Sequence, residues 1–73
     1  MPYDYSKLLG RITEVFGTQG RFADEMDLSE RTVSLKLNNK IGWKQSEIRK
    51  AVALLKISPD DIPLYFFAEQ LQN

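Results

Sequence analysis

The chain has 73 residues, which allow no more than one domain, and a domain of this size buries only about 60% of the surface that its unfolded form exposes. It contains no cysteine and no histidine, which excludes disulfide bonds and the usual structural zinc sites. The lack of cysteine and of an apolar stretch after Asp4 predicts a cytoplasmic protein without a signal peptide. The longest apolar runs are too short to span a bilayer, so no membrane partner is expected.

The formal net charge is zero, which by itself speaks against nucleic acid, because DNA-binding domains are usually basic. The charges are nevertheless segregated along the chain. Residues 31–56 contain seven basic side chains and one acidic side chain, Glu47, so their local balance is +6. The basic residues are Arg31, Lys36, Lys40, Lys44, Arg49, Lys50 and Lys56. This distribution predicts a basic face and an acidic back, although uneven charges on ordinary helix faces would give a similar pattern.

Hydrophobic spacing predicts a first helix up to about residue 16. Its apolar residues recur at intervals of three and four, the pattern of one helix face: Tyr5, Leu8, Leu9, Ile12 and Phe16. Asp4 can accept hydrogen bonds from the free N–H groups at the start of this helix. Gly17 suits the left-handed residue that closes it.

Two further short helices are expected next, each opened by a hydroxyl residue. Thr18 caps the second helix, whose inner face consists of Phe22, Ala23 and Met26. Ser29 caps the third helix, which buries Val33 and Leu37. Asn38 and Asn39 tolerate a positive φ and should end this helix.

The remaining residues predict two more helical segments. A loop at residues 41–43 precedes a fourth helix that starts near residues 44–46 and ends by Ile57. Residues 58–61 (Ser-Pro-Asp-Asp) open a fifth segment, which Pro63 should divide into two short pieces. Residues 64–67 and Leu71 are too apolar for a free tail, and the aromatic residues 65–67 either form a dimer surface or close the core. Without any clear strand pattern, the chain is expected to be all-α, a single compact bundle of about five short helices over residues 1–73.

Residues 18–37 have the spacing of a helix-turn-helix. A small residue, Ala23, stands where the two helices cross, and Asp27 follows four residues later at a turn that needs left-handed geometry. Leu28 and Val33 then pack the second helix of the pair against the first. An ordinary helical hairpin would show similar periodicity, and Asp27 stands where glycine is commoner, so the pattern alone leaves both interpretations open.

Several short runs of the chain have a more specific character. They are residues 5–12 (YSKLLGRI), 16–19 (FGTQ), 28–32 (LSERT), 35–40 (LKLNNK), 57–59 (ISP) and 65–67 (YFF). Together they resemble the short Cro/CI-type repressors of phages from Gram-positive bacteria, over nearly the whole chain. This resemblance implies a lambda-repressor-like (XRE-type) bundle with its helix-turn-helix at about residues 18–38. It also implies a transcriptional regulator of a lysis/lysogeny switch that binds double-stranded operator DNA, with homodimer formation as a further expectation.

The resemblance assigns DNA contacts to individual positions. Base readers are expected on the outward face of the third helix, where Arg31 can bind guanine, Glu30 can accept from cytosine and Leu35 can touch a thymine methyl group. The four base readers are Glu30, Arg31, Ser34 and Leu35. Phosphate contacts are expected from Gln19, Ser29, Thr32, Lys36, Asn38, Lys40 and Lys44. For any one of these polar residues, a solvent-facing position without a DNA contact is an equally good interpretation.

Other functions are judged against this prediction. Without histidine or cysteine the commonest general base and nucleophile are missing, so neither an enzyme nor a cofactor, metal or small-molecule substrate is expected. The alternative function is a modulator or antirepressor that binds the partner phage repressor. The zero net charge, Glu30 and the apolar Leu35 favour this alternative, whereas Arg31 and the +6 segment favour DNA. Trp43 is expected to cap the fourth helix, or else to join Leu35 in a protein-binding surface.

Overall fold

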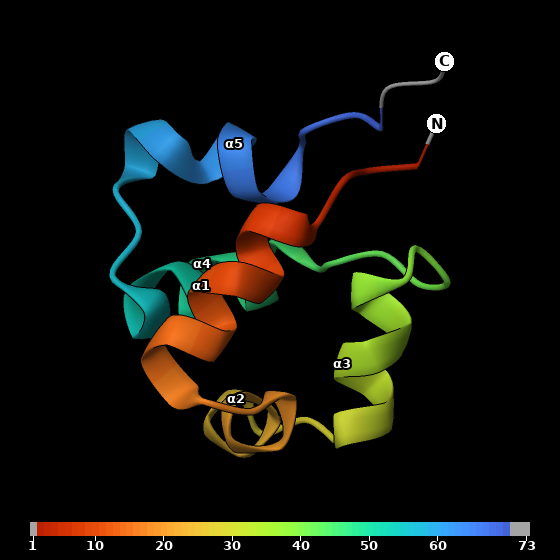
Figure 1. Cartoon of the computed structure of the whole chain (residues 1–73), viewed down its shortest axis with the longest axis vertical. Helices are drawn as coiled ribbons and strands as arrows, with labels where there is room; N and C mark the ends of the chain where they lie inside the picture. The colour runs from red at the N-terminus through yellow and green to blue at the C-terminus, as the bar shows by residue number, and fades with distance from the viewer. Residues whose placement is uncertain (1, 71–73) are drawn as a thin grey trace.

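The computed structural model describes residues 2–70, which form five α-helices and one short 3-10 helix (Figure 1). These elements are α1 (Ser6–Phe16), α2 (Gln19–Met26), α3 (Glu30–Leu37), α4 (Gln45–Leu55), the 3-10 helix (Pro59–Asp61) and α5 (Ile62–Phe66). The expectation of an all-α bundle of about five short helices is therefore confirmed. None of the helices in this range is long and apolar enough to cross a membrane.

The ends of the helices are set by local hydrogen bonds, as the sequence predicts. Thr18 Oγ1 accepts a hydrogen bond from Arg21 N at 3.2 Å, and Ser29 Oγ accepts one from Thr32 N at 3.0 Å. Asp4 Oδ1 accepts from the backbone N of Ser6 at 2.9 Å. These side chains satisfy N–H groups that have no partner inside the helix.

Left-handed residues close most of the helices. Gly17 (φ 85°), Asp27 (φ 61°) and Asn39 (φ 62°) adopt positive φ where the sequence predicts it. Lys56, which ends α4 with φ 55°, is a fourth such residue that the sequence does not indicate. A lysine is an uncommon choice there, because a side chain makes the left-handed region less favourable than it is for glycine.

The core is made from the apolar faces predicted for the helices. Its buried members are Tyr5, Leu8, Ile12, Phe22, Ala23, Met26, Val33, Ala51, Leu55, Ile57 and Phe66. The C-terminal aromatic run is divided, because Phe66 is fully buried whereas Phe67 is 48% exposed. Phe66 therefore closes the core of the single chain, and Phe67 remains at the surface. Leu71, the other apolar residue noted there, lies outside the described residues.

The helices surround α1, which packs against α2, α4 and α5. Figure 1 shows α2 almost end-on and α3 from the side, so the axes of these two helices cross at a large angle. The helix α3 stands at one edge of the molecule and packs mainly against α2. This position leaves one side of α3 and the turn after it open.

The two chain ends pair with each other, a feature that the sequence does not predict. Tyr3 and Glu69 form an isolated antiparallel bridge. Asp4 N donates to Ala68 O at 2.6 Å, and Gln70 N donates to Pro2 O at 3.3 Å. These bonds fasten α5 to the segment that precedes α1.

The side chain of Asn39 binds the N-terminal segment from its other side. Its carboxamide oxygen accepts from Tyr3 N at 2.9 Å, and its nitrogen donates to Tyr3 O at 2.9 Å. The side-chain amide of Asn39 therefore satisfies both the backbone N–H and the backbone C=O of Tyr3, as the backbone of a neighbouring β-strand would. Through this contact the turn after α3 is attached to both ends of the chain.

We expect Asn39→Gly to lower the free energy of unfolding by about 1–2 kcal/mol, because two hydrogen bonds are lost while the left-handed backbone remains accessible. Asn39→Ala should cost about 1 kcal/mol more, since alanine also disfavours positive φ. Urea denaturation of both variants separates the two contributions. A glycine variant as stable as the parent protein would show that the amide contact to Tyr3 contributes nothing.

Candidate functional site

The helices α2 and α3 are joined by a tight connection at residues 27–29. Asp27 takes the left-handed conformation, and Leu28 N donates to Ala23 O at 2.9 Å. Ala23 and Val33 are buried and Leu28 is partly buried, so these residues hold the two helices together as their spacing predicts. The outer side of α3 is therefore fixed relative to the start of α2.

The four predicted base readers lie on α3. Glu30 and Arg31 are exposed, whereas Ser34 and Leu35 are partly buried. Arg31 makes no hydrogen bond or ion pair through its side chain with any other residue between 2 and 70. Its guanidinium is the one exposed cation that α3 itself carries.

Several predicted phosphate ligands already serve the ends of α3. Ser29 Oγ donates to Thr32 Oγ1 at 2.8 Å in addition to accepting the capping bond. Asn38 Nδ2 donates to Ser34 O at 2.8 Å. Gln19 is partly buried at the first position of α2, while Lys40 and Lys44 are exposed beyond the end of α3.

Lys36 is the predicted phosphate ligand whose position does not fit a DNA contact. Its side chain is buried, with Nζ 2.7 Å from Glu47 Oε1 and 2.8 Å from the Gly42 oxygen to which it donates. The same ammonium lies 5.7 Å from the centre of the Trp43 ring. Lys36 therefore faces α4 and the loop before it, and the expectation of a phosphate contact from this residue is wrong.

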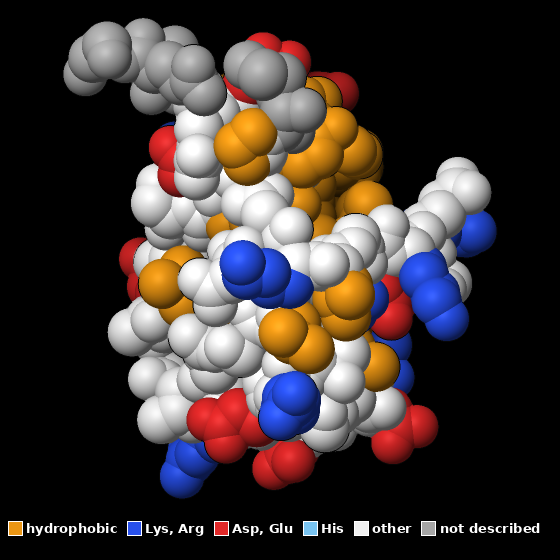
Figure 2. Space-filling model, turned by 90° about the vertical axis from the view of Figure 1, so that its right-hand side faces the viewer, with side chains coloured by type: hydrophobic (Ala, Val, Ile, Leu, Met, Phe, Trp, Pro, Cys, Tyr) orange, Lys and Arg blue, Asp and Glu red, His pale blue; other side chains and the backbone are white. Residues whose placement is uncertain are grey.

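The buried pair changes the interpretation of the charge pattern. Lys36 and Glu47 neutralise each other, so six of the seven basic residues of residues 31–56 remain exposed. Three of them, Arg49, Lys50 and Lys56, lie on α4 or directly after it. In Figure 1, α4 lies behind α1, whereas α3 stands at the edge of the molecule. Figure 2 shows that blue, red and orange side chains are interspersed on the face that carries α3. This face is therefore mixed in character, in contrast to the predicted basic face.

Glu47 is a carboxylate whose environment favours its charged form. Burial removes water from this group and by itself would raise its pKa. Hydrogen bonds from Lys36 Nζ and from Lys44 N, together with the charges of both lysines, outweigh this effect and hold the pKa of Glu47 below its ordinary value. Since Lys44 N is a free N–H group at the start of α4, one carboxylate both caps α4 and pairs with α3.

We expect Glu47→Gln and Lys36→Met each to lower the free energy of unfolding by about 3 kcal/mol, because each leaves a buried charge without its partner. The double variant should lose less than the sum of the single variants, since it leaves neither charge behind. Urea denaturation measures these differences. Lys50→Met, at an exposed position of α4, is the matched control and should change stability by no more than about 0.5 kcal/mol. Single variants as stable as this control would contradict the buried pair.

The low pKa of Glu47 also predicts acid sensitivity. A carboxyl group with a depressed pKa in the folded state stabilises the protein at pH values above its ordinary pKa of 4.5. This stabilisation is lost as the pH falls through the lower pKa of the folded state. We expect the difference in unfolding free energy between the parent protein and Glu47→Gln to be constant near neutral pH and to shrink below about pH 4.5. A difference that stays constant down to pH 2 would argue against this assignment.

The carboxylate of Glu30 lies beside the first turn of α2. A side-chain carbon added at Gly20 would be 3.5 Å from Glu30 Oε1 and 3.7 Å from Oε2. The start of a helix presents free N–H groups and the positive end of the helix dipole, which attract anions. In this chain, the carboxylate of Glu30 lies beside the start of α2, where an anion would otherwise be attracted.

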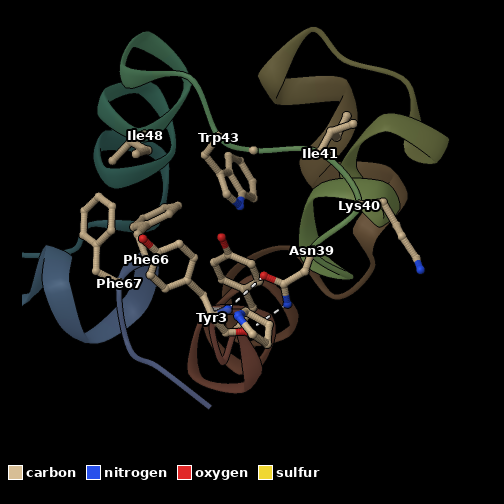
Figure 3. A pocket seen from close by; sticks show the side chains of 11 residues that line it. Tyr3, Asn39, Lys40, Ile41, Trp43, Ile48, Phe66 and Phe67 are labelled. Atoms are coloured by element: carbon tan, nitrogen blue, oxygen red, sulfur yellow. Dashed lines mark hydrogen bonds between the residues drawn. The ribbon is translucent and has the colours of Figure 1, made fainter.

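Trp43 has the packing role expected of it. Its ring stands edge-on to Phe66, with centroids 5.3 Å apart, and to Tyr5 at 6.5 Å. The indole Nε1 is shielded from water and donates to no other atom of residues 2–70. In Figure 3 this nitrogen points toward the space between the loop before α4 and α5.

Comparisons with known proteins find a family model and a solved structure that are similar to this chain. Residues 1–69 match the model of a family described as "Protein of unknown function (DUF739)". The fold is similar to the solution structure of the modulator of repression of the temperate bacteriophage TP901-1 from Lactococcus lactis. The TM-score is 0.81, the sequence identity is 61%, and the match covers 99% of this chain and 97% of that one. No curated protein gives a significant match.

Proposed function

Since the chain belongs to the DUF739 family and resembles a phage modulator of repression along its whole length, we propose that it modulates repression in a temperate phage by binding the phage repressor protein. This is the alternative that the sequence left open beside a Cro-like DNA-binding repressor. The similar structure is that of a modulator of repression, which supports this alternative more than direct operator binding.

The observation that carries this proposal is the position of Glu30. In a helix-turn-helix bound to DNA, the first helix crosses the phosphate backbone while the second enters the major groove. A phosphate approaching the start of α2 would meet the carboxylate that lies against Gly20. Two like charges about 4 Å apart repel by roughly 1–4 kcal/mol, depending on their exposure to water. This arrangement disfavours DNA on the surface where a Cro-like repressor needs it.

The other charges of α3 support the same conclusion. Nonspecific affinity for DNA depends on several lysine or arginine side chains that contact consecutive phosphates. With Lys36 buried, α3 offers the single exposed cation Arg31, directly beside Glu30. A mixed surface of this kind suits a protein partner, because protein interfaces combine apolar and charged groups of both signs.

Direct operator binding is a second candidate function, and Arg31 favours it. This exposed guanidinium lies in the first turn of α3, where helix-turn-helix proteins contact base edges, and no described residue pairs with it. A fluorescence anisotropy titration of labelled promoter DNA of the phage, with and without the phage repressor, distinguishes the two candidates. The chain alone should leave the anisotropy unchanged at physiological salt but should alter the apparent affinity of the repressor.

We expect Glu30→Gln to increase the weak DNA affinity of the chain alone by up to about tenfold, because the repulsion of a phosphate at the start of α2 disappears. The control is Asp60→Asn, which removes the same charge from the 3-10 helix, across the molecule from α3 (Figure 1). Anisotropy at low salt measures the effect.

A steep loss of DNA binding with salt for the unmodified chain alone would contradict the proposal. The logarithm of the affinity would then fall with a slope of about −0.9 for each phosphate contact. If Arg31→Ala also relaxed the preference for one base pair, the protein would act as a Cro-like repressor.

A further inference from the structure

A groove of about 540 Å³ lies between the turn after α3 and the end of α5 (Figure 3). Lys40 and Ile41 stand on one side of it and Phe66 and Phe67 on the other, with Trp43 between them. This volume is within the range of about 300–1,000 Å³ that is usual for binding pockets. The groove can therefore hold a few side chains of a partner.

The walls of the groove expose large apolar side chains. Ile41 is 42% exposed and Phe67 is 48% exposed, on opposite sides of the same depression. Single exposed apolar residues are ordinary, but several around one concavity indicate an interaction site. These two residues offer apolar contact area that no part of residues 2–70 covers.

The groove is also preformed. Phe67 packs edge-on to Tyr3, with ring centroids 5.8 Å apart, and Phe66 packs edge-on to Trp43. Asn39 binds both backbone groups of Tyr3, which fixes the turn against the N-terminal segment (Figure 3). These contacts position the rings before a partner arrives, which lowers the cost of ordering them on binding.

One charged side chain stands at the edge of the groove. Lys40 is the one charged residue that lines the groove, and it makes no ion pair with any residue between 2 and 70. In Figure 3 its side chain extends away from Trp43 and Phe66, so a carboxylate of an occupant would meet it at the outer edge of the groove.

We propose that this groove is the docking site for the repressor. It receives a short segment of that protein that inserts large apolar side chains between Ile41 and Phe67 and places a carboxylate against Lys40. The inference rests on the proposed function, to which it adds the surface used and the chemistry of the segment bound. The groove lies beside the end of α3, so repressor binding would leave the Glu30 end of that helix outside the contact.

Calorimetric titration of the full-length repressor into the full chain tests this site. Ile41→Ser and Phe67→Ser should each weaken binding by about tenfold or more, because the buried apolar area is lost. The matched controls are Val15→Ser and Leu64→Ser, which remove equally exposed apolar side chains outside the groove and should leave the affinity unchanged. Thermal denaturation by circular dichroism verifies that all four variants are folded.

Charge reversal gives an independent test. Lys40→Glu should weaken binding, and the loss should diminish at high salt, as expected for an exposed ionic contact. Lys7→Glu is the control, an exposed lysine on α1. The single tryptophan of the chain, Trp43, should also change its emission when the repressor binds.

The possible outcomes separate the two proposals. If the unmodified chain does not bind the repressor, the proposed function fails. If it binds and the groove variants bind equally well, while Arg31→Ala or Leu35→Ser weakens binding, the function stands and the groove inference is overturned. The inference is also overturned if sedimentation shows a dimer that Phe67→Ser dissociates, because the occupant is then a second copy of this chain.

Discussion

A buried ion pair between Lys36 and Glu47 holds α3 against the first turn of α4. Moving two charges out of water is costly, and here the cost is offset because the ammonium also binds the Gly42 oxygen and lies over the Trp43 ring. The contact joins α3, the loop that follows it and the first turn of α4. It adds to the packing of α3 against α2, and its ammonium lies beside Trp43.

The same contact changes what α3 can bind. Lys36, which could have bound a phosphate, forms a buried ion pair instead. Glu30 adds a negative charge at the opposite end of α3. The result is a pair of helices joined by a tight turn but with little positive charge on its outer side. Such an arrangement offers few contacts to consecutive phosphates of a nucleic acid.

The groove arises from segments that are far apart in the sequence. Tyr3 from the N-terminal segment, Asn39 and Trp43 from the turn after α3, and Phe67 from the end of α5 meet at one place. The antiparallel bridge between Tyr3 and Glu69 brings the two chain ends there. A small domain thus obtains a concave surface without any additional element, because the segment before α1 and the end of α5 line it.

Features that depend on residues close together along the chain are predictable from the sequence alone. Thr18 and Ser29 cap helices through hydrogen bonds from residues three positions ahead. Gly17 and Asn39 adopt a positive φ where the helices end. The spacing of apolar residues defines the buried face of each helix. Three other features follow from the folded arrangement: Lys36 turns inward, Asn39 binds Tyr3, and Phe66 is buried while Phe67 is exposed. These outcomes depend on partners brought together by packing. Glu47 is eleven positions from Lys36, and whether a charge is paired in the interior or left in solvent is set by the arrangement of the helices and not by local pattern.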